Sequence, residues 1–434
     1  MRSITNAGLC VLLAIFYNFA SYRLAEKQPV HIAGTVNKKF EKIRRIFEQN
    51  FLDGWESDGA AFAVYKDGQK VVDIWGGYAD IHSDRKWQKD TMTVTFSTTK
   101  AVSSICIAKL VALGKLQYDD PVSMHWPGFG KFGRENVTVQ MVLSHMSGLP
   151  YFDKLVTEEV AADHNKMRML IESEDNKLEP GKVVGYHPYT FGWLVDQIVR
   201  HVDERRRGVG QYFREEIAKE HDIDFHIGLP PQEEYRMARI STPSHSYRAS
   251  EILADFRVSK YLKSVWKLIK DTPFSRAINN PPWLQAVTRC TINNPDYHQL
   301  EQPAALGIGN ARSLAKLFSK FSEGQIVNSS FVQSLQNYYT NDTDVLFEDV
   351  VAKGHGFFYL PSERANTSYI IGHTGHGCQF VGYDLQNRLA FAYVTNGLKT
   401  GLYDLCRPYY ALQTAMYDVI EDLQTIKLEQ LTQS

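Results

Sequence analysis

A serine and a lysine three positions apart open the stretch of this sequence that could do covalent chemistry. Ser97 and Lys100 begin a run in which apolar residues recur at helical spacing and which Gly114 ends. Three residues are nearly one helical turn, so the two side chains share a face. An apolar helix would partly desolvate the lysine, which lowers its pKa and leaves an amine able to take the serine proton. The pair predicts a nucleophile with its own base.

The Ser-x-x-Lys spacing is not specific by itself, because it recurs elsewhere in the chain. The other occurrences are Ser83/Lys86, Ser264/Lys267 and Ser313/Lys316. Two further motifs give the context that separates them. One is a turn, residues 180–188, that leads to Tyr186 just before an expected helix at 191–202; the other is Gly-His-Thr-Gly-His-Gly at 372–377, where an expected strand ends. Only Ser97 both precedes these motifs and has an apolar helix behind it.

The elements that must position these residues follow from periodicity. Strands are expected early and late in the chain, and mostly helices between them. The expected strands are 60–65, 70–75, 356–360, 369–374, 379–384 and 389–395, and the expected helices are 37–51, 137–145, 191–202, 211–219, 258–269, 311–321 and 412–428. This order predicts an α+β fold of the α/β sandwich type, with one sheet built from both ends of the chain and an inserted, mostly helical domain. A cleft between two such parts is the default place for a site.

With these motifs in this order, the chain resembles the serine β-lactamase and penicillin-binding-protein superfamily, whose Ser-x-x-Lys carries the nucleophile. It looks most like the class C-type branch of esterases and β-lactamase-domain proteins. Further pieces of the resemblance are Val71–Gly77, Leu143–Pro150, Ala311–Ala315 and Phe391–Asn396. The resemblance implies one hydrolase domain over 38–417 with an antiparallel sheet flanked by helices. Its sheet part would be 38–118 and 321–417, its helical part 119–320, and 418–434 would be a helix end and tail.

The resemblance also implies roles for individual residues. Ser97 would be the acylated nucleophile and Lys100 its proton acceptor. Tyr186 would shuttle protons to the leaving group, provided cationic neighbours lower its pKa from about 10. His373 would donate to Tyr186 or to a substrate carboxylate.

Backbone and strand positions complete the site that the resemblance implies. Thr374 and Gly375 would line the cleft and bind substrate. The oxyanion hole would use the backbone N–H groups of Ser97 and His376.

Two departures from the β-lactamase pattern bear on the substrate. The tyrosine motif is Tyr-x-Asn in β-lactamases, but Pro188 occupies its third position here, and His373 replaces a permanently charged lysine. Both changes argue against β-lactam hydrolysis and are compatible with an esterase or a peptidase. The prediction is therefore a serine hydrolase that acts through an acyl-enzyme on ester or amide bonds. The alternative is an inactive relative that keeps the fold as a structural or interaction module.

Composition limits the partners. The chain has 434 residues, 44% of them hydrophobic, and a formal net charge of −1, which gives no electrostatic basis for nucleic-acid binding. No C-x-x-C or H-E-x-x-H pattern is present, so we expect no metal and no cofactor; His373 and His376 could seed a metal site only weakly. Cys106 falls on the apolar face of the Ser97 helix and is expected to be a buried thiol. The sequence does not indicate which oligomeric state the protein adopts.

The N-terminus predicts a targeting segment. Residues 7–20 are almost uninterruptedly apolar, short for a spanning helix and suited to a signal region. We expect residues 1–25 to be an uncleaved signal anchor of a single-pass protein in the secretory pathway; the alternative is secretion after cleavage. A signal anchor of the secretory pathway would place the body on the lumenal or extracellular side, whereas the basic residues at 38–45 favour a cytoplasmic body. Glycosylation acceptors are predicted at Asn136, Asn328, Asn341 and Asn366.

Overall fold

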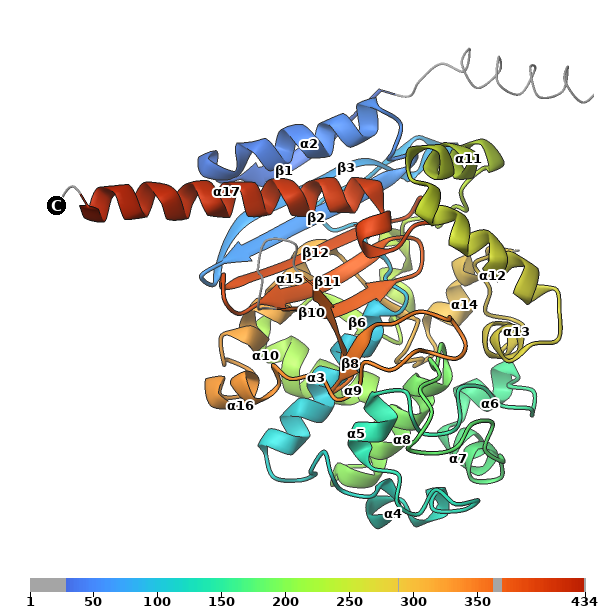
Figure 1. Ribbon diagram of the computed structural model, residues 1–434. Coiled ribbons are helices and arrows are strands. Elements are labelled where there is room, and N and C mark those ends of the chain that lie inside the picture. The colour runs from blue at the N-terminus through green and yellow to red at the C-terminus, as the bar shows by residue number, and fades with distance from the viewer. Residues whose placement is uncertain (1–28, 288, 362–368, 433–434) are drawn as a thin grey trace, which may run out of the picture. The chain divides into compact units, whose positions relative to one another are not determined.

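A computed structural model describes residues 29–287, 289–361 and 369–432 of the chain. Its centre is an antiparallel sheet with the strand order β1-β3-β2-β12-β11-β10-β9-β8, to which β4 adds beside β3 (Figure 1). The strands are β1 Ile32–Val36, β2 Gly59–Lys66, β3 Gln69–Asp80, β4 Arg85–Lys86, β8 Ala352–Gly354, β9 Phe357–Pro361, β10 Tyr369–Gly375, β11 Gln379–Asp384 and β12 Leu389–Thr395. The predicted sheet from both ends of the chain is confirmed, with β2 and β12 joining the two ends at its middle.

An Asp-Gly turn joins β2 to β3. Asp67 and Gly68 both have positive φ, 51° and 70°, in the two-residue turn between β2 and β3. This is the backbone that hairpin turns require and that Asp-Gly supplies at low cost. The turn fixes the pairs next to it, Tyr65 with Lys70 and Lys66 with Gln69, and the register shifts between Val64 and Tyr65.

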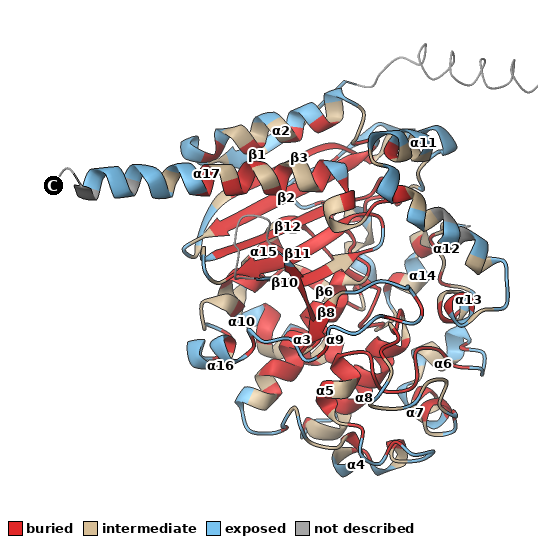
Figure 2. Ribbon diagram, in the orientation of Figure 1, coloured by how far each residue is buried: buried red, intermediate tan, exposed pale blue. Residues whose placement is uncertain are grey.

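Helices cover both faces of the sheet because its side chains alternate. Phe62 and Val64 pack with α2 Glu41–Leu52 and α17 Arg407–Thr432 on one face. Ala61 and Ala63 face the other side, where small side chains leave room for α3 Thr98–Ala112 and α15 Ala311–Ser322. Buried residues fill both layers (Figure 2). The α15 helix, which crosses the predicted boundary at 321, packs directly on β12 and β2.

The middle of the chain is mostly helical, as predicted. Its helices are α4 Val122–His125, α5 Val139–Leu143, α6 Glu158–Ala162, α7 His164–Glu172, α8 Thr190–Val202, α9 Val209–Phe213, α10 Lys219–His221, α11 His245–Ala254, α12 Lys260–Leu268, α13 Pro273–Asn279 and α14 Pro295–His298, and α16 Ser329–Ser334 follows α15. A small sheet has the order β5 Thr93–Val94, β7 Gly307–Gly309 and β6 Phe225–Ile227. The expected helix at 211–219 is divided into α9, a π-helical stretch and α10.

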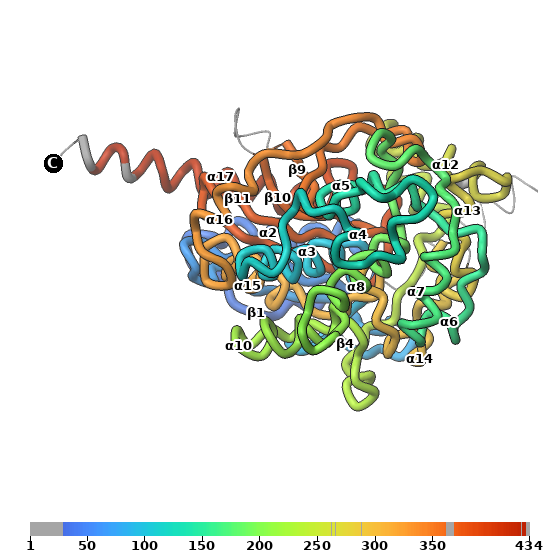
Figure 3. Tube along the Cα trace, turned by 90° about the horizontal axis from the view of Figure 1, so that it is seen from below, coloured from blue at the N-terminus to red at the C-terminus, as the bar shows by residue number. Residues whose placement is uncertain are grey.

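The α3 helix lies between the sheet and the helical region. It packs against α8, α9 and β10. Figure 3 shows it between α8 and β10. Twelve of its fifteen residues are buried, including Cys106, which is a free thiol as predicted. Gly356 permits the close approach of the β8–β9 turn, since a Cβ there would lie 1.9 Å from Ser104 Oγ. The α3 helix is therefore packed on several sides.

The prediction of a single-pass membrane protein is corrected. Within the described ranges, none of the helices combines the length and apolar character that crossing a bilayer requires. The segment on which the prediction rested, residues 1–25, lies outside the described residues. The membrane-anchored localisation, its secreted alternative and the membrane as a partner are not retained.

Candidate active site

Ser97 lies at the start of α3, on the wall of a cavity. The residue before it, Phe96, is buried and has a φ of 50°, a left-handed conformation that is costly for a bulky side chain. Hydrogen bonds from the N–H groups of Thr99 and Lys100 to the carbonyls of Phe96 and Ser97, both at 3.0 Å, fix this turn. The turn presents Ser97 to the cavity at the tip of a buried helix.

Lys100 is fully buried one turn away, and three oxygens surround its amine. Its Nζ lies 3.1 Å from Ser97 Oγ, 2.8 Å from the carbonyl oxygen of Pro188 and 3.0 Å from that of Ala304. Burial lowers the pKa of Lys100 well below its usual 10.5. A neutral amine has two N–H donors for the two carbonyls, which leaves its lone pair for the Ser97 hydroxyl proton. The geometry thus suits Lys100 as the base that the sequence predicts.

Tyr186 packs over the same amine. The Lys100 Nζ lies 4.9 Å from the centroid of its ring. The condition that cationic neighbours lower its pKa is not met: desolvation of the phenol raises the pKa, and the hydrogen bond with Ser97 offsets this only in part. Lys100, which packs against the ring, is itself desolvated and has a lowered pKa. Tyr186 is therefore a neutral O–H donor near Ser97 rather than a phenolate.

Two buried histidines behind Tyr186 hold its loop in place. The His187 backbone N–H donates to His145 Nδ1 at 3.1 Å, and the His145 ring lies 4.5 Å from the Tyr186 ring. His187 Nδ1–H donates to the Gly185 carbonyl at 2.5 Å, so its Nε2 accepts from Ser147 Oγ at 2.7 Å. Burial lowers the pKa of His187 to about 3, which keeps this network neutral. From the sequence alone, both histidines are most simply interpreted as structural or surface residues.

His373 lies on β10, close to the site but behind the cavity wall. Its buried ring stacks on Phe358 with 3.9 Å between centroids, and the Tyr186 ring is 6.2 Å away. Its Nδ1 lies 2.6 Å from the Thr374 carbonyl and so carries the proton, which leaves Nε2 without a hydrogen-bond partner among the described residues. Burial lowers the pKa of His373 well below 6.5. His373 is a neutral ring and not a fixed cation.

The end of β10 approaches the segment before Ser97. Gly375 has no room for a side chain, because a Cβ there would lie 2.6 Å from the Thr95 carbonyl oxygen. This contact brings the His376 backbone next to the start of α3, and the Phe96 and His376 rings meet edge to face at 5.3 Å. Ser97, Thr374, Gly375 and His376 line one cavity. The arrangement suits the predicted oxyanion hole of the Ser97 and His376 N–H groups.

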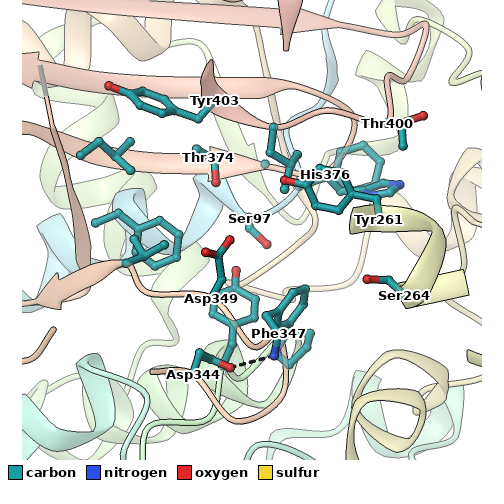
Figure 4. A pocket seen from close by; sticks show the side chains of 18 of the residues that line it. Ser97, Tyr261, Ser264, Asp344, Phe347, Asp349, Thr374, His376, Thr400 and Tyr403 are labelled. Atoms are coloured by element: carbon teal, nitrogen blue, oxygen red, sulfur yellow. Dashed lines mark hydrogen bonds between the residues drawn. The ribbon is translucent and has the colours of Figure 1, made fainter. Parts of the chain in front are cut away.

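The cavity has a volume of about 820 Å³. Figure 4 shows Ser97 between Thr374 and His376 on one side and the loop with Asp344, Phe347 and Asp349 on the other. Residues of α12 and α13 form a further wall that sequence reasoning missed, since their facing positions do not follow from local periodicity. A pocket of this size is typical of a small-molecule site.

The predicted glycosylation acceptors fall on separate parts of the chain. Asn136, Asn328 and Asn341 are exposed. Asn328 caps α16, accepting a hydrogen bond from the Phe331 N–H at 2.8 Å, and Asn341 lines the cavity. Asn366 lies outside the described residues. Their glycosylation stays a prediction.

Comparisons with known proteins show what this chain is similar to. The family model described as Beta-lactamase matches residues 47–415. The protein named Esterase/beta-lactamase LipL, from Mycobacterium tuberculosis (strain ATCC 25618 / H37Rv), is 29% identical over 381 residues, 86% of this chain and 84% of that protein. A penicillin-binding protein homologue from Caulobacter crescentus is similar in structure, with a TM-score of 0.75 and 27% identity over 90% of this chain and 100% of the other. A family VIII carboxylesterase has a TM-score of 0.77 at the same identity and coverage.

Proposed function

This chain belongs to the beta-lactamase family, and from that membership we propose that it hydrolyses carboxylic esters through an acyl-enzyme on Ser97. It is a serine hydrolase of the esterase-like kind rather than an antibiotic-degrading enzyme. The observation that carries the proposal is the Lys100 amine, buried and 3.1 Å from the Ser97 hydroxyl. An inactive module would have no use for a desolvated lysine at that position.

In the acylation step, neutral Lys100 takes the proton of Ser97 as Oγ attacks the ester carbonyl carbon. The carbonyl π electrons move to its oxygen, which the N–H groups of Ser97 and His376 stabilise. When the tetrahedral adduct collapses, the C–O bond to the alcohol breaks. The Tyr186 O–H protonates the leaving alkoxide and is reprotonated by the Lys100 ammonium.

In the deacylation step, water attacks the acyl carbon and gives its proton to neutral Lys100 through the Tyr186 hydroxyl. The oxyanion hole acts again, and Ser97 leaves with a proton returned from Lys100. Proton numbers therefore balance over the cycle without an external base. His373 is proposed to act only through Tyr186 and Phe358, because its ring does not line the cavity. Thr374 and Gly375 are proposed to align the bound ester along β10.

The charges around the cavity support an ester over a β-lactam. A β-lactam carboxylate requires a cation, and the wall lysines already have anionic partners: Lys399 Nζ lies 2.6 Å from a Glu56 oxygen and Lys353 Nζ 3.7 Å from an Asp344 oxygen. Arg248 also lines the cavity, and it donates to the carbonyl of Pro243. His373 is neutral, and Pro188 offers a carbonyl in place of an asparagine amide. Losing one charge-assisted contact and one neutral hydrogen bond lowers catalytic efficiency on the order of 10- to 10³-fold.

Fluorophosphonate labelling tests the proposal, since the probe reacts only with an activated serine. The wild-type enzyme should be labelled and Ser97→Ala should not, whereas Ser83→Ala and Ser313→Ala, which carry the same Ser-x-x-Lys spacing, should be labelled like the wild type. The same preparations should hydrolyse p-nitrophenyl esters and leave nitrocefin nearly unchanged. A label on another serine, or faster turnover of nitrocefin than of the ester, would contradict the proposal.

A further inference from the structure

The cavity is much larger than the chemistry at Ser97 needs. An acetyl or propionyl group would fill a small part of about 820 Å³. Pockets of 300–1,000 Å³ bury ligands of drug size. The side chains that line the rest of the cavity therefore indicate the chemistry of the remainder of the substrate.

Apolar side chains continue from the catalytic tyrosine toward α13. The Phe347 ring meets Tyr186 edge to face at 5.3 Å and Phe274 at 5.1 Å. Leu268 of α12 and Ile278 of α13 line the cavity beyond them. Together they make an apolar path that begins next to the reacting atoms.

Part of this apolar surface is in contact with water. Phe347 is 38% exposed and Val350 53% exposed, and both line the cavity. Apolar surface that faces a concave, water-filled space is stabilised when an apolar ligand covers it. The loop that carries both residues is anchored at its base, because Asp344 accepts hydrogen bonds from the N–H groups of Leu346 and Phe347 at 3.1 Å. The wall is thus preformed.

The charged groups around the cavity are mostly matched within the protein. Lys260 Nζ lies 3.0 Å from an Asp349 oxygen, and the Glu56 and Asp344 pairs described above account for Lys399 and Lys353. Arg248 also lines the cavity and donates from Nε to the Pro243 carbonyl at 3.2 Å. Most of the lining would bind a neutral group better than an ion.

We propose that the substrates are neutral esters with one large apolar group, such as an alkyl chain of about eight carbons or more, held between α12–α13 and the loop 341–351. This inference rests on the proposed esterase function and names its substrate class. Short esters would be hydrolysed through the same Ser97 chemistry but would leave the apolar path empty.

Chain-length series on the wild-type enzyme test the proposal. One series varies the acyl part, p-nitrophenyl acetate to decanoate, and the other varies the alcohol part, methyl to octyl acetate, each below its micelle concentration. Burying a methylene is worth up to about fourfold in kcat/KM. We expect at least a tenfold rise from two to eight carbons in one of the series. Flat or falling values in both would overturn the proposal, and so would a clear preference for an ester with a terminal carboxylate, which would point to Arg248.

A matched pair of variants locates the group in the cavity. Ser264 faces the cavity from α12 (Figure 4), whereas Ser334 is exposed on α16 and does not line it. Ser264→Phe should lower the ratio of decanoate to acetate kcat/KM at least tenfold, and Ser334→Phe should leave the ratio unchanged. An unchanged ratio in Ser264→Phe would place the chain elsewhere and overturn the proposal.

A binding measurement distinguishes failure of this inference from failure of the proposed function. Ser97→Ala should bind methyl decanoate more tightly than methyl butyrate by calorimetry, whether or not the wild type is active. Labelled, ester-hydrolysing enzyme without a chain-length preference would refute the substrate class alone. Absence of labelling and of all ester hydrolysis would refute the catalytic function itself.

Discussion

The carbonyl oxygen of Pro188 accepts a hydrogen bond from Lys100 Nζ at 2.8 Å. The sequence indicated that proline at this position removes a hydrogen bond to the substrate amide, because a proline has neither a side-chain amide nor a backbone donor. The structure shows that an acceptor is still supplied there by the backbone, which any residue type can provide. With the Ala304 carbonyl at 3.0 Å it occupies both N–H groups of a neutral amine, so the lone pair faces Ser97.

Replacing the base tests this arrangement. Lys100→Met keeps the length of the side chain and removes the amine, so acylation of Ser97 should slow by on the order of 10²-fold or more, the usual scale for a positioned acid–base group. The rate of labelling by a fluorophosphonate measures acylation directly. Lys109→Met is the matched control, because Lys109 lies on the same helix and its Nζ donates to the Glu216 carbonyl, away from Ser97. Equal rates for the two variants would remove Lys100 from the mechanism.

The lowered pKa of Lys100 also predicts how stability depends on pH. Between the depressed pKa in the fold and the usual value near 10.5, the unfolded chain binds a proton that the folded chain does not. The free energy of unfolding therefore rises with pH in this window, by about 1.4 kcal/mol per pH unit for one proton. Denaturation of the wild type and of Lys100→Met at several pH values isolates this contribution, since the other titrating groups cancel in the difference. A difference that is independent of pH, or one that falls as pH rises, would show that Lys100 is charged in the fold.

The acylation rate should fall as pH drops through the same depressed pKa.

Local patterns in the sequence predicted the strands and the first turn of α3 well. β11 and β12 have the bounds that alternation indicated, 379–384 and 389–395, and Ser97 and Lys100 share a face as their spacing requires. Both results depend on periodicity within a few residues. The order of the motifs along the chain excluded Ser264 and Ser313, and the apolar helix that follows Ser97 favoured it over Ser83.

Features that depend on distant segments could not be predicted. The direction of the Tyr186 pKa shift follows from burial by residues far away in the sequence. The carbonyls around Lys100 belong to Pro188 and Ala304, and a backbone carbonyl leaves no pattern in the sequence because every residue has one. The stacking of His373 on Phe358, which takes the histidine out of the cavity, is a pairing of β9 with β10. The pairing of Cys378 with Cys406 likewise follows from tertiary structure and not from spacing.

Tyr186 and His373 should differ in their effect on catalysis, because only Tyr186 contacts the reacting groups. Tyr186→Phe removes the O–H donor while keeping the ring against Lys100, so kcat/KM for an ester should fall on the order of 10²-fold. His373→Leu keeps an apolar partner for Phe358 and should cost about tenfold or less. Steady-state rates on p-nitrophenyl butyrate for both variants test this difference. A larger loss in His373→Leu than in Tyr186→Phe would place His373 in the proton path.

The disulfide between Cys378 and Cys406 should matter for both stability and catalysis. It joins the turn after β10, two residues beyond His376, to the start of α17, across 28 residues of sequence. Removing it in Cys378→Ser/Cys406→Ser should lower the free energy of unfolding by about 2–4 kcal/mol. The turn also holds the His376 N–H of the proposed oxyanion hole. Complete loss of one such donor lowers the rate by on the order of 10²–10³-fold, and we expect acylation to slow at least tenfold. Thermal melts measure the first effect, and fluorophosphonate labelling well below the melting temperature measures the second, with the free thiol variant Cys290→Ser as the control. A lower melting temperature with an unchanged labelling rate would show that the disulfide stabilises the fold without positioning the oxyanion hole.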